Sequence, residues 1–174
     1  IRNFESNLKN NISANKYLEE RGLKAETVKE FRIGFAPDSW RVLGDHLKRK
    51  GYSEVEIEKA GLAIQGNKGP YDRFRSRIMF PLEDSAGRVI GFTGRIFGEE
   101  PEGAAKYVNS PQTMLYDKSN FLYGYGKSKG EIRQAKNAVV VEGQMDMIMS
   151  YQAGVRNVVA VSGTALTDMH LKNL

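Results

Sequence analysis

The sequence predicts an α/β fold in two parts. Residues 1–130 have the pattern of a basic α+β subdomain, and residues 131–174 that of the first part of an α/β domain with parallel strands. Two observations lead to this prediction. The spacing of apolar residues changes from helical to strand-like near residue 62, and the chain then ends in a strand–helix–strand succession. Because such crossovers are right-handed and join parallel strands, the succession begins a parallel sheet.

The first helices are marked by the glycines that follow them. Tyr17–Arg21 has helical spacing, and Gly22 stands where a C-cap glycine ends a helix. A second helix is predicted over residues 25–31, with its end near Gly34. Residues 33–37 then form a short strand or an extended link.

Two more helices complete the helical start. Asp38 or Ser39 is a suitable N-cap for a third helix, and we expect Trp40 and the leucines of that helix to lie in the core. Ser53 has Glu56 three residues later, which is the capping-box pattern of a fourth helix.

Short strands predominate after residue 62. The runs 62–64, 78–82 and 89–93 are predicted strands, and the last two form a β-hairpin with Gly87 where a left-handed residue is needed. Residues 122–125 form a short strand or a turn. Turn and loop segments separate these elements, at residues 66–70, 98–103 and 110–113.

The end of the chain alternates helices and strands. A helix over 127–135 precedes the run Ala138–Val141, for which we expect a buried strand. A helix over 145–153 and a strand over 158–161 follow, and a last helix begins near Asp168.

Two carboxylates flank the turn after the first of these strands. Glu142 follows the strand directly, and Asp146 lies four residues later in the first helical turn. Open α/β sheets bind ligands at the carboxyl ends of their strands. The pair could therefore hold one hard divalent cation such as Mg²⁺, which prefers oxygen ligands. The structural alternative is that Glu142 belongs to an ordinary turn and that Asp146 only favours the positive end of the helix dipole.

The composition is that of a globular protein. The chain has 174 residues, of which 40% are hydrophobic and 27% charged, and no apolar run approaches the length needed to cross a bilayer. We expect a cytoplasmic protein, because no signal-peptide pattern is present. The absence of cysteine excludes disulfides and thiolate metal sites, and the two histidines have no ligand-like partners at zinc spacing.

The net charge is +5, and basic and aromatic side chains are interleaved between residues 71 and 118. That mixture suits phosphate contact together with base or ribose stacking. Arg73, Arg75 and Arg77 alternate, so a strand would place them on one face. They could pair with neighbouring carboxylates. We favour phosphate contact, because three guanidiniums on one face repel one another and arginine binds phosphate bidentately.

Several segments match sequence motifs of one known protein family, and they occur in the same order along the chain. They are Tyr17–Leu23 with Ile33–Pro37, the arginine-rich Tyr71–Leu82, Gly87–Arg95, Lys106–Pro111 with Lys118, and Val141–Asp146. In these motifs the chain resembles the catalytic core of bacterial replicative DNA primases of the DnaG type. Val141–Asp146 matches the first acidic motif of their Toprim domain.

The resemblance implies a primase N-terminal subdomain over residues 1–130 and the truncated first part of a Toprim domain over 131–174. It implies a DNA-dependent RNA polymerase that makes short RNA primers on single-stranded DNA by nucleotidyl transfer with Mg²⁺ or Mn²⁺. Glu142 would be the leading catalytic carboxylate and a metal ligand, and Asp146 a supporting metal ligand.

The resemblance also implies contacts to nucleic acid or nucleotide. The residues concerned are Arg73, Arg75, Arg77, Arg95, Lys106, Tyr107, Asn109 and Lys118. Taken alone, Tyr107 could stack on a base or pack in the core, and a lone lysine is usually solvated. Gly163 and Thr164 follow a strand, where they could form a phosphate loop at a helix start or an ordinary helix cap.

Two parts of the family pattern are missing. Zinc is expected only in an N-terminal domain outside this cysteine-free chain, and the Asp-x-Asp motif of the metal site is expected after Leu174. The implied partners are a single-stranded DNA template, an RNA primer, nucleoside triphosphates and, through a C-terminal domain outside the chain, a replicative helicase. No membrane partner is expected.

Two alternative functions stay open. One is another Toprim enzyme, such as a primase-helicase of phage or organelle type, although the arginine-rich motif favours a primase. The other is a non-catalytic module that binds single-stranded DNA.

Overall fold

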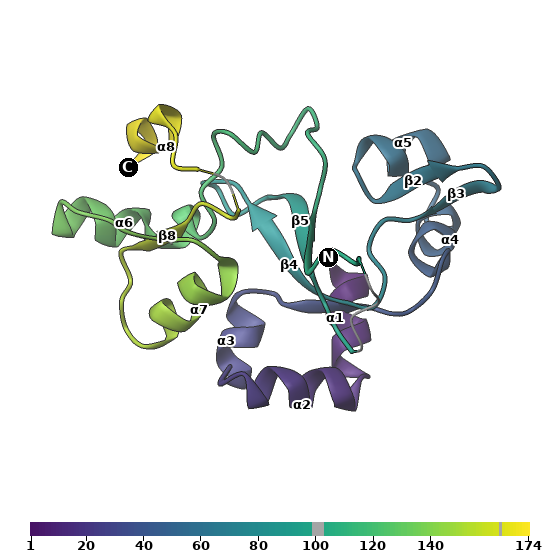
Figure 1. The fold of residues 1–174 in the computed structure, drawn as a ribbon, viewed down its shortest axis with the longest axis horizontal. Helices are drawn as coiled ribbons and strands as arrows, with labels where there is room; N and C mark the ends of the chain where they lie inside the picture. Colours follow the sequence, from purple (N-terminus) through teal and green to yellow (C-terminus); the bar gives the residue numbers. More distant parts are fainter. Residues whose placement is uncertain (99–102, 164) are drawn as a thin grey trace.

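The computed structural model describes residues 1–98, 103–163 and 165–174, and its elements are spread along one long axis (Figure 1). The centre is a four-stranded antiparallel sheet with the order β1-β4-β5-β6. The predicted β-hairpin is confirmed, and Gly87 in its turn has the expected positive φ of 79°. The strands are β1 (Gly34–Ala36), β4 (Arg77–Glu83), β5 (Val89–Ile96) and β6 (Tyr107–Asn109).

Three helices lie beneath this sheet in Figure 1: α1 (Arg2–Lys9), α2 (Ile12–Glu20) and α3 (Ala25–Glu30). The helices α2 and α3 confirm the first two predicted helices, and Gly22 ends α2 with a φ of 82°. The helix α1 packs directly on β1, because a Cβ atom added to Gly34 would lie 2.5 Å from the Cβ of Phe4.

The right end of the molecule in Figure 1 contains α4 (Val42–Arg49), α5 (Glu54–Lys59) and the hairpin of β2 (Ala63–Gly66) with β3 (Gly69–Asp72). The predicted capping box of Ser53 and Glu56 is confirmed at α5. The predicted cap of the third helix is wrong, because α4 begins at Val42 with Arg41 at its N-cap and without a side-chain cap. Trp40 was expected in the core, but 62% of it is exposed.

The left end contains α6 (Tyr125–Ala135), β7 (Val139–Val141), α7 (Gln144–Gln152), β8 (Val158–Ala160) and α8 (Asp168–Asn173). The predicted parallel pairing of β7 with β8 is confirmed. The expectation that β7 is buried is wrong, because Val139 and Val140 are 40% and 39% exposed. Within the described residues β7 pairs only with β8, whereas β8 is also bridged to Tyr123.

One apolar core joins the helical layer, the central sheet and the left end. Leu18 and Phe31 from the helices, Phe80 from β4 and Ile148 from α7 are all members of it. The strand β4 is buried on both faces, because its alternate residue Met79 belongs to a second core cluster on the other side. The expected division at residue 130 falls inside α6, and it stays a prediction. None of the helices described is long and apolar enough to span a membrane.

Candidate functional site

Glu142 and Asp146, which we call the acidic turn, occupy the positions predicted for them. Glu142 follows β7, and Asp146 is the third residue of α7. The main-chain oxygen of Glu142 accepts a hydrogen bond of 3.0 Å from the N–H of Ser162, which ties this turn to the end of β8. The side chain of Glu142 is exposed, and no ion pair or hydrogen bond of its carboxylate is found within the described residues.

Local sequence explains this geometry. The β-branched residues of β7 favour a strand, and the glycine that follows Glu142 adopts an extended conformation at the N-cap of α7. One carboxylate oxygen of Asp146 accepts the N–H of Gly143 at 3.1 Å, so Asp146 does cap its helix. Its other oxygen remains available, so the structural and the ligand roles are compatible.

A second group of side chains, the central arginine cluster, consists of Tyr17, Arg21, Arg95 and Tyr107. Arg95 donates hydrogen bonds to the hydroxyls of Tyr17 at 2.7 Å and Tyr107 at 2.9 Å. The guanidinium of Arg21 lies over the ring of Tyr17, 5.2 Å from its centroid. These residues come from α2, β5 and β6, so the cluster assembles only in the folded chain.

The cluster keeps its positive charge. Desolvation lowers the pKa of Arg95, but the two tyrosine hydroxyls raise it by more, and the net shift is upward. Tyr17 and Arg21 were not predicted as site residues. Arg21 is the C-cap of α2, four residues after Tyr17, and this spacing of an aromatic and a cationic side chain was the available signal.

A third group lies at the right end of the molecule. The guanidinium of Arg75 is 4.3 Å from the ring centroid of Trp40 and 5.1 Å from that of Tyr71. We call Trp40, Tyr71 and Arg75 the outer aromatic platform. It borders a groove of about 410 Å³ lined by residues 40–41 and 66–69 with Tyr71. An exposed indole beside a cation can stack on a base while the cation meets a phosphate.

The prediction that Arg73, Arg75 and Arg77 share one face of a strand is wrong. Residues 73–76 lie between β3 and β4, and Ser76 has a φ of 47°, which breaks the alternation. Arg77 is only 8% exposed and donates to main-chain oxygens of Gly94, Ala105 and Lys106.

Arg73 is half-buried, so its side chain is less enclosed than that of Arg77. Desolvation lowers the pKa of its guanidinium, and its Nε is buried without a hydrogen-bond partner in the described part of the chain.

The remaining predicted contact residues lie near β6. Lys106 is exposed directly before that strand, Lys118 is half-buried in the following loop, and Asn109 ends the strand. Asn109 pairs with Thr93 across β5 and β6. The side-chain oxygens of both residues are buried, and neither has a hydrogen-bond partner within the described residues.

The predicted phosphate loop does not lie at a helix start. Gly163 has a φ of 80° in the turn after β8, but α8 begins only at Asp168 and is capped by the hydroxyl of Thr167. Thr164, the other residue of that prediction, lies outside the described residues.

The acidic turn offers the type of ligand that a hard cation prefers, and it offers two such ligands. No group of three or more histidine, aspartate or glutamate side chains that could hold a metal is found among the described residues. The acidic turn supplies two carboxylates, and carboxylate oxygens match Mg²⁺ or Mn²⁺ and not a structural zinc site.

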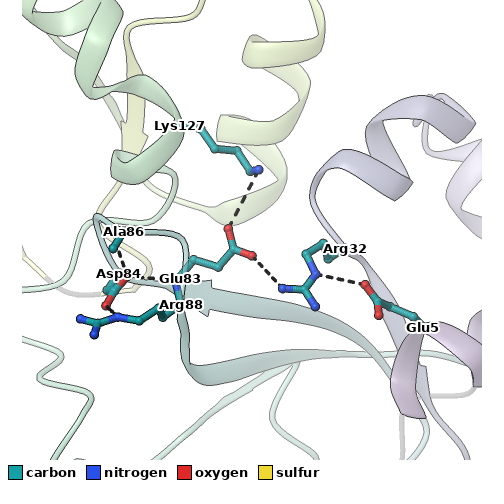
Figure 2. A network of polar contacts seen from close by, with 7 residues as sticks. All are labelled: Glu5, Arg32, Glu83, Asp84, Ala86, Arg88 and Lys127. Atoms are coloured by element: carbon teal, nitrogen blue, oxygen red, sulfur yellow. Dashed lines mark hydrogen bonds and ion pairs between the residues drawn. The ribbon is translucent and has the colours of Figure 1, made fainter. Parts of the chain in front are cut away.

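Ion pairs link α6 to the sheet and to the helical layer (Figure 2). Glu83, the last residue of β4, lies between Lys127 of α6 at 4.0 Å and Arg32 at 3.6 Å. Arg32 also pairs with Glu5 of α1 at 3.2 Å. The side chain of Glu83 is only 18% exposed, so these contacts are partly shielded from solvent.

Comparisons with known proteins agree with the primase resemblance of the sequence. Residues 3–129 match the model of the DNA primase catalytic core, N-terminal domain, and residues 136–174 match that of the Toprim domain. A DNA primase of Clostridium acetobutylicum is 44% identical over 99% of this chain, and one of Staphylococcus aureus is 46% identical over 89%. The chain spans 28% and 26% of the length of these two relatives.

Solved structures extend the likeness to the fold. The RNA polymerase domain of Mycobacterium tuberculosis primase DnaG, in complex with a double-stranded DNA oligomer with a 6-nucleotide overhang, has a TM-score of 0.91 and 42% identity. The alignment covers 97% of this chain and 53% of that domain. A DnaG primase catalytic domain bound to single-stranded DNA has a TM-score of 0.85 and 38% identity, over 97% of this chain and 55% of that one. The chain therefore belongs to the bacterial DNA primase family, as a member with the N-terminal domain of the catalytic core and a Toprim match.

Proposed function

We propose that this chain is part of an enzyme that makes short RNA primers on single-stranded DNA by nucleotidyl transfer. The observation that carries the proposal is Glu142, an exposed carboxylate at the carboxyl end of a parallel strand in a chain of the primase family. Sheets of this kind bind their ligands at that edge. Nucleoside triphosphates and an RNA primer are the reactants that such a reaction requires.

The acidic turn would hold a divalent cation, Mg²⁺ or Mn²⁺, which when bound lowers the pKa of an attacking hydroxyl and stabilises charge on phosphate oxygens. Glu142 has a free carboxylate for this role or for accepting the proton of the hydroxyl. Asp146 supports it with the oxygen that does not cap α7.

The central arginine cluster supplies positive charge for a triphosphate. Arg95 is oriented by two tyrosine hydroxyls, so little side-chain freedom is lost when it meets a phosphate. Lys106 adds an exposed charge beside Tyr107. Asn109 ends the same strand, and its side-chain oxygen is buried without a partner in the described chain, so we include Asn109 only as a weaker contact.

The template would reach the molecule over the outer aromatic platform. Trp40 offers a stacking surface, and Arg75, Arg73 and Arg41 offer charges near it. A solved relative is a primase domain bound to single-stranded DNA, which supports DNA binding by the present chain, while the path over the platform rests on the contacts of Trp40 and Arg75. We include Lys118 as a weaker contact and assign Arg77 to structure, because its guanidinium is used by main-chain oxygens. A replicative helicase is proposed only as a partner of a region outside this chain.

The test uses a polypeptide extended past Leu174 to the length of the solved RNA polymerase domains. We expect Mg²⁺-dependent primer synthesis on single-stranded DNA, and we expect Glu142→Gln to reduce it by about 100-fold or more while DNA affinity stays unchanged. Glu131→Gln, an exposed glutamate on α6, removes the same charge and is the control. Equal activity of the two variants would contradict the proposal.

A second candidate function is a module that binds single-stranded DNA without catalysis. The outer aromatic platform favours it, because the platform lies at the opposite end of the molecule from α7 and needs no metal (Figure 1). DNA binding without primer synthesis by the extended polypeptide would select this second function.

A further inference from the structure

Gln152 connects two parts of the candidate site through one side chain. It is the last residue of α7, and its amide oxygen accepts a hydrogen bond from the N–H of Lys24 at 2.9 Å. Its amide nitrogen donates to the main-chain oxygen of Gly22, also at 2.9 Å. Both halves of the amide are therefore bonded to the turn between α2 and α3.

The two elements joined by Gln152 carry the two charged groups of the site. Gly22 directly follows Arg21, which with Tyr17 on α2 forms half of the central arginine cluster. The helix α7 begins beside Glu142 and carries Asp146 in its first turn. A shift of α7 relative to this turn would change the distance between the carboxylates and the arginines.

Apolar contacts also bring the two elements together, and they are less directional than hydrogen bonds. A Cβ atom on Gly22 would lie 3.2 Å from the terminal methyl of Met149, and the ring of Tyr151 meets Phe31 edge-on at 5.3 Å. Such contacts are non-directional, and a methionine side chain adapts to small shifts. The paired hydrogen bonds of Gln152 are directional, and they hold only at one position of α7 along the turn.

We propose that Gln152 is a positioning residue that sets the distance between the acidic turn and the central arginine cluster. The role in catalysis rests on the proposed function, because it assumes that the two groups act on one nucleotide. The position of α7 itself does not depend on that assumption and is measured separately.

The first experiment measures the distance directly. The chain contains no cysteine, so Lys16→Cys on α2 and Ser150→Cys on α7 can be spin-labelled without background. We expect a narrow distance distribution in the labelled parent and a broadened or displaced one when Gln152→Ala is added. Asn157→Ala is the matched control, because it removes an exposed amide that bonds to Asn137 at 2.6 Å within the left end and does not touch α2.

The second experiment measures kinetics in the extended polypeptide. We expect Gln152→Ala to lower kcat about tenfold with unchanged affinity for single-stranded DNA, since both charged groups remain but are misplaced. Gln152→Glu keeps the acceptor for Lys24 and loses the donor to Gly22, so it should recover part of kcat. The control Asn157→Ala should retain parental kcat.

The outcomes separate the two claims. If the distance distribution of Gln152→Ala coincides with that of the parent, the positioning role is wrong whatever the activity. If the distance distribution changes but kcat matches that of Asn157→Ala, Gln152 does set the position of α7, and the claim that this position matters for the reaction is wrong. An inactive extended parent would contradict the proposed function, while the distance measurement would still decide whether Gln152 fixes α7.

Discussion

Arg77 is a charged residue inside the central sheet, and it donates hydrogen bonds to main-chain oxygens. Its guanidinium reaches the oxygens of Gly94 at 3.0 Å, Ala105 at 2.9 Å and Lys106 at 3.3 Å. The side chain of Arg77 fits here because Gly94 has no side chain. A Cβ atom on Gly94 would lie only 2.9 Å from the Cδ of Arg77. Arg77 thereby fastens the segment before β6 to the sheet.

We expect Arg77→Met to lower the free energy of unfolding by about 2–4 kcal/mol, because it removes several charge-assisted hydrogen bonds at a buried position. Arg77→Lys should lose less, since an ammonium keeps the charge but cannot span all three oxygens. Urea unfolding measures both changes. The affinity of the folded Arg77→Met variant for single-stranded DNA should remain parental, and a large loss of affinity would show that Arg77 contacts phosphate after all.

Single residues were predictable where local signals decide their positions. Glu142 and Asp146 could be placed because a β-branched run, a glycine and helical spacing occur within ten residues. The positions of the alternating arginines at 73, 75 and 77 could not be predicted, because Ser76 has a left-handed conformation that breaks the alternation. Serine has no particular preference for that conformation, so the sequence gives no sign of it. Arg95 and Tyr107 were predicted as contact residues, but their assembly with Tyr17 was not, since the hydrogen bond from Arg95 to Tyr17 joins residues 78 positions apart.

At the scale of elements, α4 begins without a cap of its own and receives one from a distant strand. The carboxylate of Asp72, at the end of β3, accepts the N–H groups of Leu43 and Gly44 at 2.8 Å each. Asp72 is 3% exposed, and desolvation raises the pKa of its carboxyl although the two N–H groups lower it in part. This contact joins the hairpin of β2 and β3 to the helix beside it.

The raised pKa fixes the direction of a pH effect. The folded state holds the Asp72 proton more tightly than the unfolded state does, so this contribution to stability is fully present below the unfolded pKa of about 3.9. It is lost as the pH rises through the folded pKa. We therefore expect the parent to lose stability relative to Asp72→Asn over that window, as measured by urea unfolding at a series of pH values. A relative gain over the same window would contradict the assignment.

Removal of the cap has a separate cost. Asp72→Ala leaves two N–H groups of α4 without an acceptor, and we expect it to lower the free energy of unfolding at neutral pH by roughly 1–3 kcal/mol. The cap of α5 illustrates the opposite case. Ser53 and Glu56 are three residues apart, so their capping box could be predicted, whereas Asp72 acts on a helix about 30 positions earlier in the chain.

At the scale of the whole molecule, three groups with different chemistry are distributed along the fold. The acidic turn lies at the left end, the outer aromatic platform at the right end, and Arg95 of the central arginine cluster on the sheet between them (Figure 1). The sequence predicted the parallel pairing and the hairpin, because both follow from local succession. It did not predict the exposure of β7, which depends on how many neighbours the strand has.

The distribution of charge leads to a prediction about salt. If Arg73 and Arg75 each contact one phosphate, replacing both by alanine should weaken binding of single-stranded DNA and lower the slope of log K against log salt by about 1.4, at about 0.7 per contact. The double variant Lys9→Ala with Lys29→Ala is the control, because it also removes two positive charges from the net +5, but at a groove beneath the sheet. It should leave the slope near that of the parent. Trp40→Ala should weaken binding without changing the slope, because stacking releases no counterions. Fluorescence anisotropy at several salt concentrations measures all three. Equal slopes for the two charge variants would mean that the net charge, and not a template path over the outer aromatic platform, attracts the DNA.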